Sequence, residues 1–179
     1  MSNIIILTGS VRRNSNTDLL AKAFADGAKL HHHVETLSVA DYHVHPCTGC
    51  NACFQREGNT CVQQDDMQKL YPKLAAADVI VLATPVYFYG VSAQLKAVID
   101  RLHTPMRNTF RVKKLALLAV AGAELPAVFD AILTQYQLVL DFFHLENAGT
   151  VLVRGVREMG AIEGNPALGE AFHLGESMP

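Results

Sequence analysis

Four cysteines lie close together in the chain and carry its most evident metal or redox chemistry. They are spaced Cys-x2-Cys-x2-Cys-x7-Cys, at Cys47, Cys50, Cys53 and Cys61. Because they share one segment, they cannot tie distant parts of a secreted fold together as a disulfide framework does. Four thiolates at this spacing can surround a [4Fe-4S] cluster. The alternatives are a zinc site, a dithiol switch and four free thiols, although structural zinc usually has two separated Cys-x2-Cys pairs.

Polar and basic side chains crowd residues 8–17, and this predicts a site for an anion. The segment offers hydroxyls, an amide, guanidinium groups and the free N–H groups of a helix start. It lacks the Walker lysine and the Gly-x-Gly-x-x-Gly fingerprint of dinucleotide sites, so we expect a terminal monophosphate. The expected hydrogen-bond donors are Ser10, Ser15, Asn16 and Thr17, and Arg12 offsets the charge. In the alternative interpretation, the Asn and Ser residues only form a turn and cap a helix.

Consecutive aromatic residues predict a second site, for a planar ring. The run is Pro85, Val86, Tyr87, Phe88, Tyr89 and Gly90. Aromatic faces suit a ring system, and the glycine lets the backbone approach it closely. Aromatic residues are more often part of a core, but this run stands in a loop between two well-marked elements.

The frame that positions these segments is predicted by short β-branched runs alternating with helical periodicity. Strands are expected at residues 4–7, 34–39, 78–83, 115–121 and 150–153, with helices between them. The first helix is expected to have Asn16 or Thr17 as its N-cap. The pattern matches an α/β doubly wound, flavodoxin-like parallel sheet of order 2-1-3-4-5 in three layers. Ligands bind such sheets at the carboxyl ends of the strands, where residues 8–17 and 84–90 belong.

Three motifs in this order resemble the NAD(P)H-dependent FMN reductase group of flavodoxin-like proteins. They are Gly9-Ser10-x-Arg12-x-x-Ser15-Asn16-Thr17, Asp78-Val79-Ile80-Val81-x-Ala83-Thr84-Pro85-Val86-Tyr87 and Ser92-Ala93-Gln94-Leu95-Lys96-x-x-Ile99-Asp100-Arg101. The resemblance implies that FMN places its phosphate on the first motif and its isoalloxazine ring against residues 85–90. It also implies a homodimer or homotetramer with the flavin near a subunit boundary. Residues 121–124 lack the Gly-rich run common in such proteins, so a third wall stays unassigned.

The cysteine segment, with Asp65-Asp66-Met67 just downstream, resembles the iron-sulfur flavoproteins. That resemblance implies one [4Fe-4S] cluster on Cys47, Cys50, Cys53 and Cys61. We refer to residues 41–65 as the cysteine loop. Because it follows the second predicted strand, we expect it near the opening of the flavin site.

Composition restricts the classes of protein and of partner. The chain has 179 residues, half of them hydrophobic, and a net charge of -2. This length suits a single domain, 1–179, and the charge argues against a nucleic-acid partner. We see no signal peptide and no run of about 18 apolar residues that could span a membrane. We therefore expect a cytoplasmic protein without membrane contact.

The predicted function is an FMN-dependent oxidoreductase that passes electrons from NAD(P)H to a quinone, a flavin, another small molecule or a redox protein. Because the flavin itself carries hydride and electrons, no catalytic side chain is assigned. One alternative is an iron-sulfur flavoprotein or flavodoxin-type electron carrier that does not oxidise NAD(P)H productively. A metal or redox sensor is a further alternative.

Overall fold

Five parallel strands form one sheet in the order β2-β1-β3-β4-β5, which confirms the predicted topology. The computed structural model describes residues 1–179. The strands are β1 (Asn3–Thr8), β2 (His33–Ser38), β3 (Val79–Pro85), β4 (Lys114–Val120) and β5 (Glu146–Val153). The helices are α1 (Asn16–Ala28), α2 (Met67–Ala76), α3 (Ala93–Arg101), α4 (Asp130–Phe143) and α5 (Ala167–Glu176).

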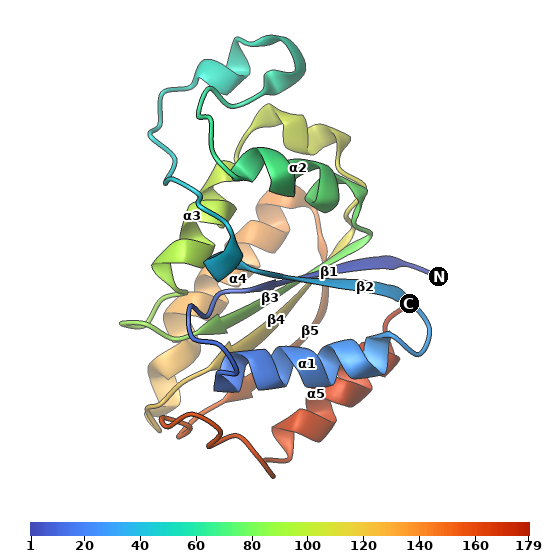
Figure 1. Ribbon diagram of the computed structural model, residues 1–179, viewed down its shortest axis with the longest axis vertical. Coiled ribbons are helices and arrows are strands. Elements are labelled where there is room, and N and C mark those ends of the chain that lie inside the picture. The colour runs from blue at the N-terminus through green and yellow to red at the C-terminus, as the bar shows by residue number, and fades with distance from the viewer.

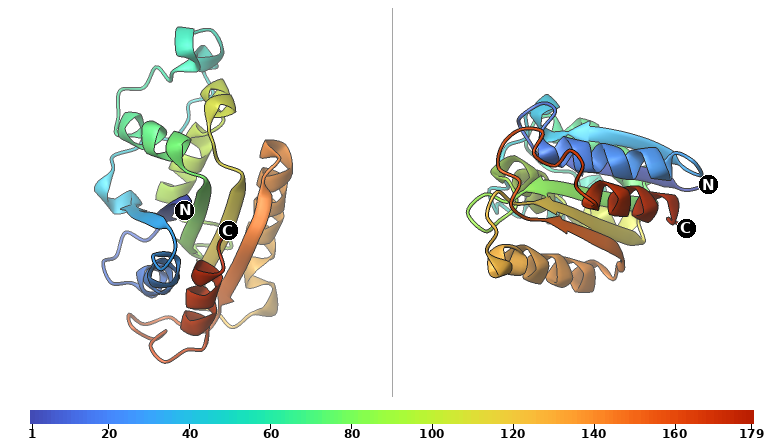
Figure 2. Two further views of the ribbon diagram at one scale, coloured as in Figure 1. Left: turned by 90° about the vertical axis from the view of Figure 1, so that its right-hand side faces the viewer. Right: turned by 90° about the horizontal axis from the view of Figure 1, so that it is seen from below.

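Helices cover both faces of the sheet, with α2, α3 and α4 on one face and α1 and α5 on the other (Figure 1, Figure 2). In β1, Ile5 and Leu7 pack on the first face, whereas Ile4 and Ile6 pack on the second. A parallel strand covered on both faces is continuously apolar rather than alternating. The inner strands therefore stand out in the sequence, and their carboxyl ends meet at one edge of the sheet.

Two glycines let α1 and α5 cross in backbone contact. A Cβ atom at Gly27 would lie 2.0 Å from the backbone oxygen of Phe172. A Cβ atom at Gly175 would lie 2.1 Å from the backbone oxygen of Phe24. Because no side chain fits at these separations, both positions require glycine. The crossing helps to fix α1, whose first turn directly follows the loop after β1.

The bounds of some elements differ from the prediction where apolar periodicity is weak. Strand β5 begins at Glu146 rather than near residue 150, because Glu146 pairs with Lys114 of β4 although its side chain is exposed. From its sequence we expect the last helix at residues 165–173, whereas α5 runs from Ala167 to Glu176. A 3-10 turn, Pro126–Phe129, precedes α4. None of the helices combines the length and apolar character required to cross a bilayer.

Candidate functional site

A cleft of about 200 Å³ opens at the carboxyl ends of the central strands, and we call it the phosphate cleft. Eight of the predicted site residues line it: Ser10, Arg12, Ser15, Asn16, Thr17, Pro85, Val86 and Tyr87. Phe88, Tyr89 and Gly90 are not among the lining residues. The fold thus brings together the loop after β1 and the loop after β3, which are far apart in the chain.

The loop after β1 is stabilised by its own hydroxyl groups. The Ser10 hydroxyl donates to the Arg12 carbonyl and accepts from the Arg12 N–H, both at 3.1 Å. Ser15, rather than the predicted Asn16 or Thr17, is the N-cap of α1, and Asp18 completes a capping box with it. The sequence pattern Ser-x-x-Asp could have identified this cap. The N–H groups of the first helical turn have no partner within the helix and favour an anion.

The side chain of Asn16 has a different role from the predicted one. Its amide nitrogen donates to the carbonyls of Val156, at 3.1 Å, and Glu158, at 2.8 Å. Its amide oxygen accepts from the N–H of Ile162, at 3.3 Å. Because both amide protons are used, only the backbone N–H of Asn16 remains to bind an anion.

The third wall of the phosphate cleft comes from residues that the sequence analysis did not assign. They come from the carboxyl end of β4 and the loops after β4 and β5: Val120, Gly122, Val156, Arg157 and Met159. A Cβ atom at Gly122 would lie 3.3 Å from the Cβ atom of Arg157, so a larger residue would push against this arginine. The signal that could have found Arg157 is its position just beyond the carboxyl end of a strand.

Arg12 and Arg157 give the phosphate cleft a positive potential. Both side chains line the cleft and both residues are exposed. Neither belongs to an ion pair within the chain, in contrast to Arg13, which pairs with Asp41. Guanidinium groups without a carboxylate partner are available for a phosphate.

The aromatic run forms a tight two-residue hairpin beside the phosphate cleft. Tyr87 and Gly90 exchange backbone hydrogen bonds of 2.9 and 3.1 Å. The tip residues, Phe88 and Tyr89, have φ values of 48° and 66°. A turn of this kind favours Asn-Gly, and bulky residues in the left-handed region are strained. Phe88 is 98% exposed, so the interpretation of this residue as core is wrong.

The four cysteines line one shared cavity of about 760 Å³, between the cysteine loop and helices α3 and α4. All four thiols are free, and no three metal-ligating side chains of the chain converge on one point. Hydrogen bonds from the Ala52 backbone and the Thr48 side chain lower the pKa of Cys50. A set of four thiols on one cavity, one of them with a lowered pKa, fits the donor chemistry of an iron-sulfur cluster.

The cysteine cavity and the phosphate cleft share no lining residue. The cysteine loop extends beyond α2 and α3 (Figure 1). That this loop lies near the opening of the flavin site stays a prediction.

Known proteins resemble this chain over most of its length. The family model described as NADPH-dependent FMN reductase matches residues 2–153. An iron-sulfur flavoprotein of Methanocaldococcus jannaschii is 36% identical over 171 residues, which cover 94% of this chain and 83% of the relative. An iron-sulfur flavoprotein of Methanosarcina thermophila is 34% identical over 164 residues, covering 90% of this chain and 82% of the relative.

A solved structure confirms the fold. The NAD(P)H:quinone oxidoreductase of Methanothermobacter marburgensis superposes with a TM-score of 0.80 at 16% identity, covering 99% of both chains. The phosphate cleft fits FMN, because a helix N-terminus and two unpaired guanidinium groups meet in it. The match over residues 2–153 shows that the chain belongs to the NADPH-dependent FMN reductase family, as an oxidoreductase related to the iron-sulfur flavoproteins.

Proposed function

We propose that this FMN-dependent oxidoreductase binds the FMN phosphate in the phosphate cleft and the isoalloxazine ring against the hairpin of residues 85–90. The observation that carries the proposal is the meeting of Arg12, Arg157 and the first turn of α1 at one cavity. A phosphate monoester carries a charge of about -1.5 to -2 at neutral pH. Two guanidinium groups and a helix N-terminus match that charge.

The residues of the phosphate cleft have different roles in binding. Thr17 and the backbone N–H groups of residues 16 and 17 hold the phosphate oxygens. Ser10 and Ser15 hold the loop in shape. The Ser15 hydroxyl accepts from the Asp18 N–H and keeps its own proton for the phosphate, whereas the Ser10 hydroxyl gives its proton to the Arg12 carbonyl. Asn16 ties the first turn of α1 to the loop that carries Arg157. The cleft is therefore organised before the cofactor arrives.

The isoalloxazine ring belongs at the mouth of the cleft rather than inside it. A volume of about 200 Å³ is below the roughly 300–1,000 Å³ of pockets that enclose ligands of drug size. Beside the cleft, Phe88 and Tyr89 are 98 and 49% exposed, and Tyr87, which lines the cleft, is 42% exposed. These side chains orient the ring and leave one face open to a nicotinamide or an acceptor.

The bound flavin supplies hydride acceptance from NAD(P)H and electron release in one or two steps. The acceptors we propose are a quinone, free flavin, another small molecule or a redox protein. We further propose a homodimer or homotetramer, because the hairpin tip, Leu138 and Phe142 leave large apolar side chains exposed. Residues 1–179 then form a single FMN-binding domain. We place it in the cytoplasm, where a reducing environment keeps the four thiols free.

The second candidate is an iron-sulfur flavoprotein with one [4Fe-4S] cluster on Cys47, Cys50, Cys53 and Cys61. Its support is that all four thiols line the same cavity. This cavity shares no lining residue with the phosphate cleft.

One anaerobic preparation tests the proposed function. We expect bound FMN, recovery of FMN after its removal, and oxidation of NADPH when a quinone is added. Riboflavin, which lacks the phosphate, is expected to bind more weakly than FMN by at least about tenfold, the factor that corresponds to one charged hydrogen bond. Equal binding of FMN and riboflavin would contradict the phosphate site. FMN binding without NADPH oxidation would favour the electron carrier.

A further inference from the structure

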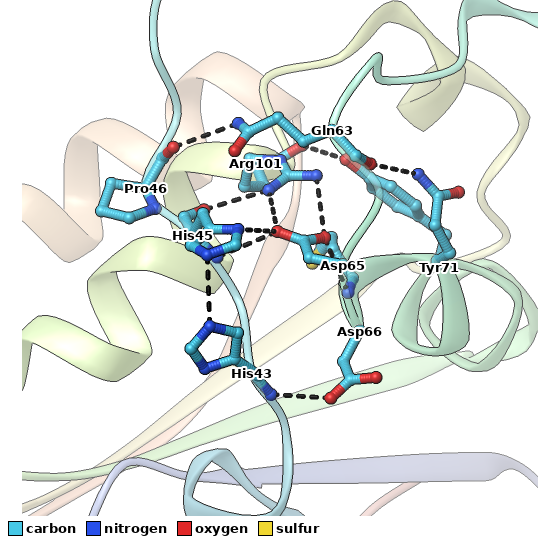
Figure 3. Close-up of polar contacts among 10 residues, drawn as sticks. His43, His45, Pro46, Gln63, Asp65, Asp66, Tyr71 and Arg101 are labelled. Atoms are coloured by element: carbon cyan, nitrogen blue, oxygen red, sulfur yellow. Dashed lines mark hydrogen bonds and ion pairs between the residues drawn. The ribbon is translucent and has the colours of Figure 1, made fainter.

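The cysteine loop is closed at its base by hydrogen bonds between two antiparallel segments, which we call the neck: residues 43–46 and 63–66 (Figure 3). The Asp66 N–H donates to the His43 carbonyl at 3.1 Å, and the His43 N–H donates to the Asp66 carboxylate at 2.8 Å. The His45 N–H donates to the Asp65 carboxylate at 2.9 Å. All four cysteines lie between the two sides of the neck.

Arg101, at the end of α3, joins both sides of the neck with one guanidinium group (Figure 3). Its Nη1 atom donates to the His45 carbonyl at 3.0 Å and to Asp65 Oδ2 at 2.7 Å. Its Nη2 atom donates to Asp65 Oδ1 at 3.2 Å. The side chains of Arg101 and Asp65 are each 1% exposed. Only the planar guanidinium group of an arginine can donate to these three oxygen atoms at once.

The ion pair is not explained by stability alone. Replacing a buried ion pair by apolar residues is often neutral or stabilising, because both charges must leave water. Here the cost is larger, since the Nε atom of Arg101 is buried without any hydrogen-bond partner. A buried donor of this kind calls for a functional reason.

The guanidinium group also faces the chemistry of the cysteine loop. Arg101 lines the cavity that all four thiols line. Its guanidinium group therefore places a positive charge at the wall of this cavity while it holds the neck.

We propose that Arg101 is a positioning residue that keeps the neck closed, so that the four thiols stay on one cavity in which they can gather around a metal, and that its charge acts on the metal centre they bind. The metal centre rests on the proposed cluster, whereas closure of the neck does not. A cluster gains negative charge on reduction, so a nearby cation raises its reduction potential. Closing a loop in advance removes the entropy that a metal would otherwise have to offset.

Two variants separate the two effects of Arg101. Arg101→Met removes both the fork and the charge, whereas Arg101→Lys keeps the charge but cannot bridge three acceptors. Arg111→Met is the matched control, because Arg111 pairs with Asp78 on the surface, far in sequence from the neck. FMN content reports correct folding, since the phosphate cleft contains none of these residues.

The measurements are the rate of cluster loss to an iron chelator, the cluster reduction potential and amide hydrogen exchange in metal-free protein. The amides followed are those of His45 and Met67, which both donate to the Asp65 carboxylate. We expect Arg101→Met to speed exchange and cluster loss by at least about tenfold and to make the potential more negative. We expect Arg101→Lys to speed both rates while the potential stays near that of the wild type. Wild-type rates in Arg101→Met, or full recovery of both rates in Arg101→Lys, would overturn the proposal.

The two proposals fail in different ways. If the wild-type chain assembles no cluster, the iron-sulfur function is wrong, and amide exchange in the metal-free chain still decides whether Arg101 closes the neck. If the cluster forms but substitution of Arg101 changes neither the exchange rate nor the rate of cluster loss, the proposed cluster is supported and the proposed role of Arg101 is wrong.

Discussion

The side-chain amide of Asn16 donates a 2.8 Å hydrogen bond to the carbonyl of Glu158, and so links the first turn of α1 to the loop after β5. We expect Asn16→Ala to weaken FMN binding by about tenfold, because each buried hydrogen bond that is lost costs about 1–3 kcal/mol. The loop that carries Arg157 is then no longer tied to α1. Titration of the metal-free, flavin-free chain with FMN measures the effect. An unchanged affinity, with loss of thermal stability alone, would mean that the link serves only the fold.

The two unpaired arginines of the phosphate cleft should discriminate FMN from riboflavin. We expect Arg12→Met and Arg157→Met each to weaken FMN binding by about tenfold, since a hydrogen bond to a charged group contributes about 1.5–3 kcal/mol. Riboflavin binding should stay the same in both variants. Arg13→Met is the matched control, because Arg13 pairs with Asp41 outside the phosphate cleft. Equal losses for both flavins would point to the ring rather than the phosphate.

Relieving the strain at the hairpin tip should raise the stability of the protein and lower its turnover. Replacing Phe88 and Tyr89 together by Asn and Gly supplies the residues that such a turn prefers. We expect the flavin-free variant to unfold at a higher temperature, by an amount equivalent to about 1 kcal/mol, because strained left-handed residues are removed. We also expect slower NADPH oxidation, because the aromatic surface beside the ring is lost. A stabilised variant with full turnover would show that the two rings take no part in the reaction.

Cys50 should be the most reactive thiol of the reduced, metal-free chain. Its pKa is lowered by hydrogen bonds from the Ala52 backbone and the Thr48 side chain, so a larger fraction is thiolate at neutral pH. Brief treatment with iodoacetamide followed by peptide mass spectrometry measures the order of modification. We expect Cys50 to react first, and Thr48→Val to slow its reaction. Uniform modification of all four cysteines would show that these hydrogen bonds do not activate Cys50.

Asp65 should make closure of the neck sensitive to acid. Hydrogen bonds from Arg101 and the His45 N–H outweigh the effect of burial and lower the pKa of this carboxyl. A lowered pKa means that the stabilisation is present above the unfolded value of about 3.9 and is lost as the pH falls through the folded value. We expect proteolysis within the cysteine loop to rise below about pH 4, and Asp65→Asn to remove that dependence.

The control for this acid effect concerns His45, whose Nδ1 atom lies 3.6 Å from Asp65. In a His45→Asn background the carboxyls of Asp65 and Asp66 both remain at the neck. The same acid dependence should persist there and should be lost only when Asp65→Asn is added. Its loss in His45→Asn alone would show that the side chain of His45 is needed for the effect.

The order of the strands and the position of the cleft followed from the sequence, because both rest on local patterns. Continuous apolar runs such as 78–83 mark inner parallel strands, and the loops after them must meet at one edge of the sheet. The segments that line two walls of the phosphate cleft were therefore predictable from one strand and one loop at a time.

The remaining features depend on contacts between distant residues, and only the tertiary structure decided them. The side chain of Asn16 was predicted to bind the phosphate. In the structure its amide oxygen instead accepts from the N–H of Ile162, which lies 146 positions away in the sequence. Arg157 had no motif and joined the cleft through the path of the chain after β5. Likewise, the four cysteines were evident from their spacing alone. Their shared cavity, and the contact of Arg101 with both sides of the neck, arise from the packing of α3 against the neck. Local sequence determines which groups are present, whereas the long-range hydrogen bonds of buried polar groups determine which of them remain free to act.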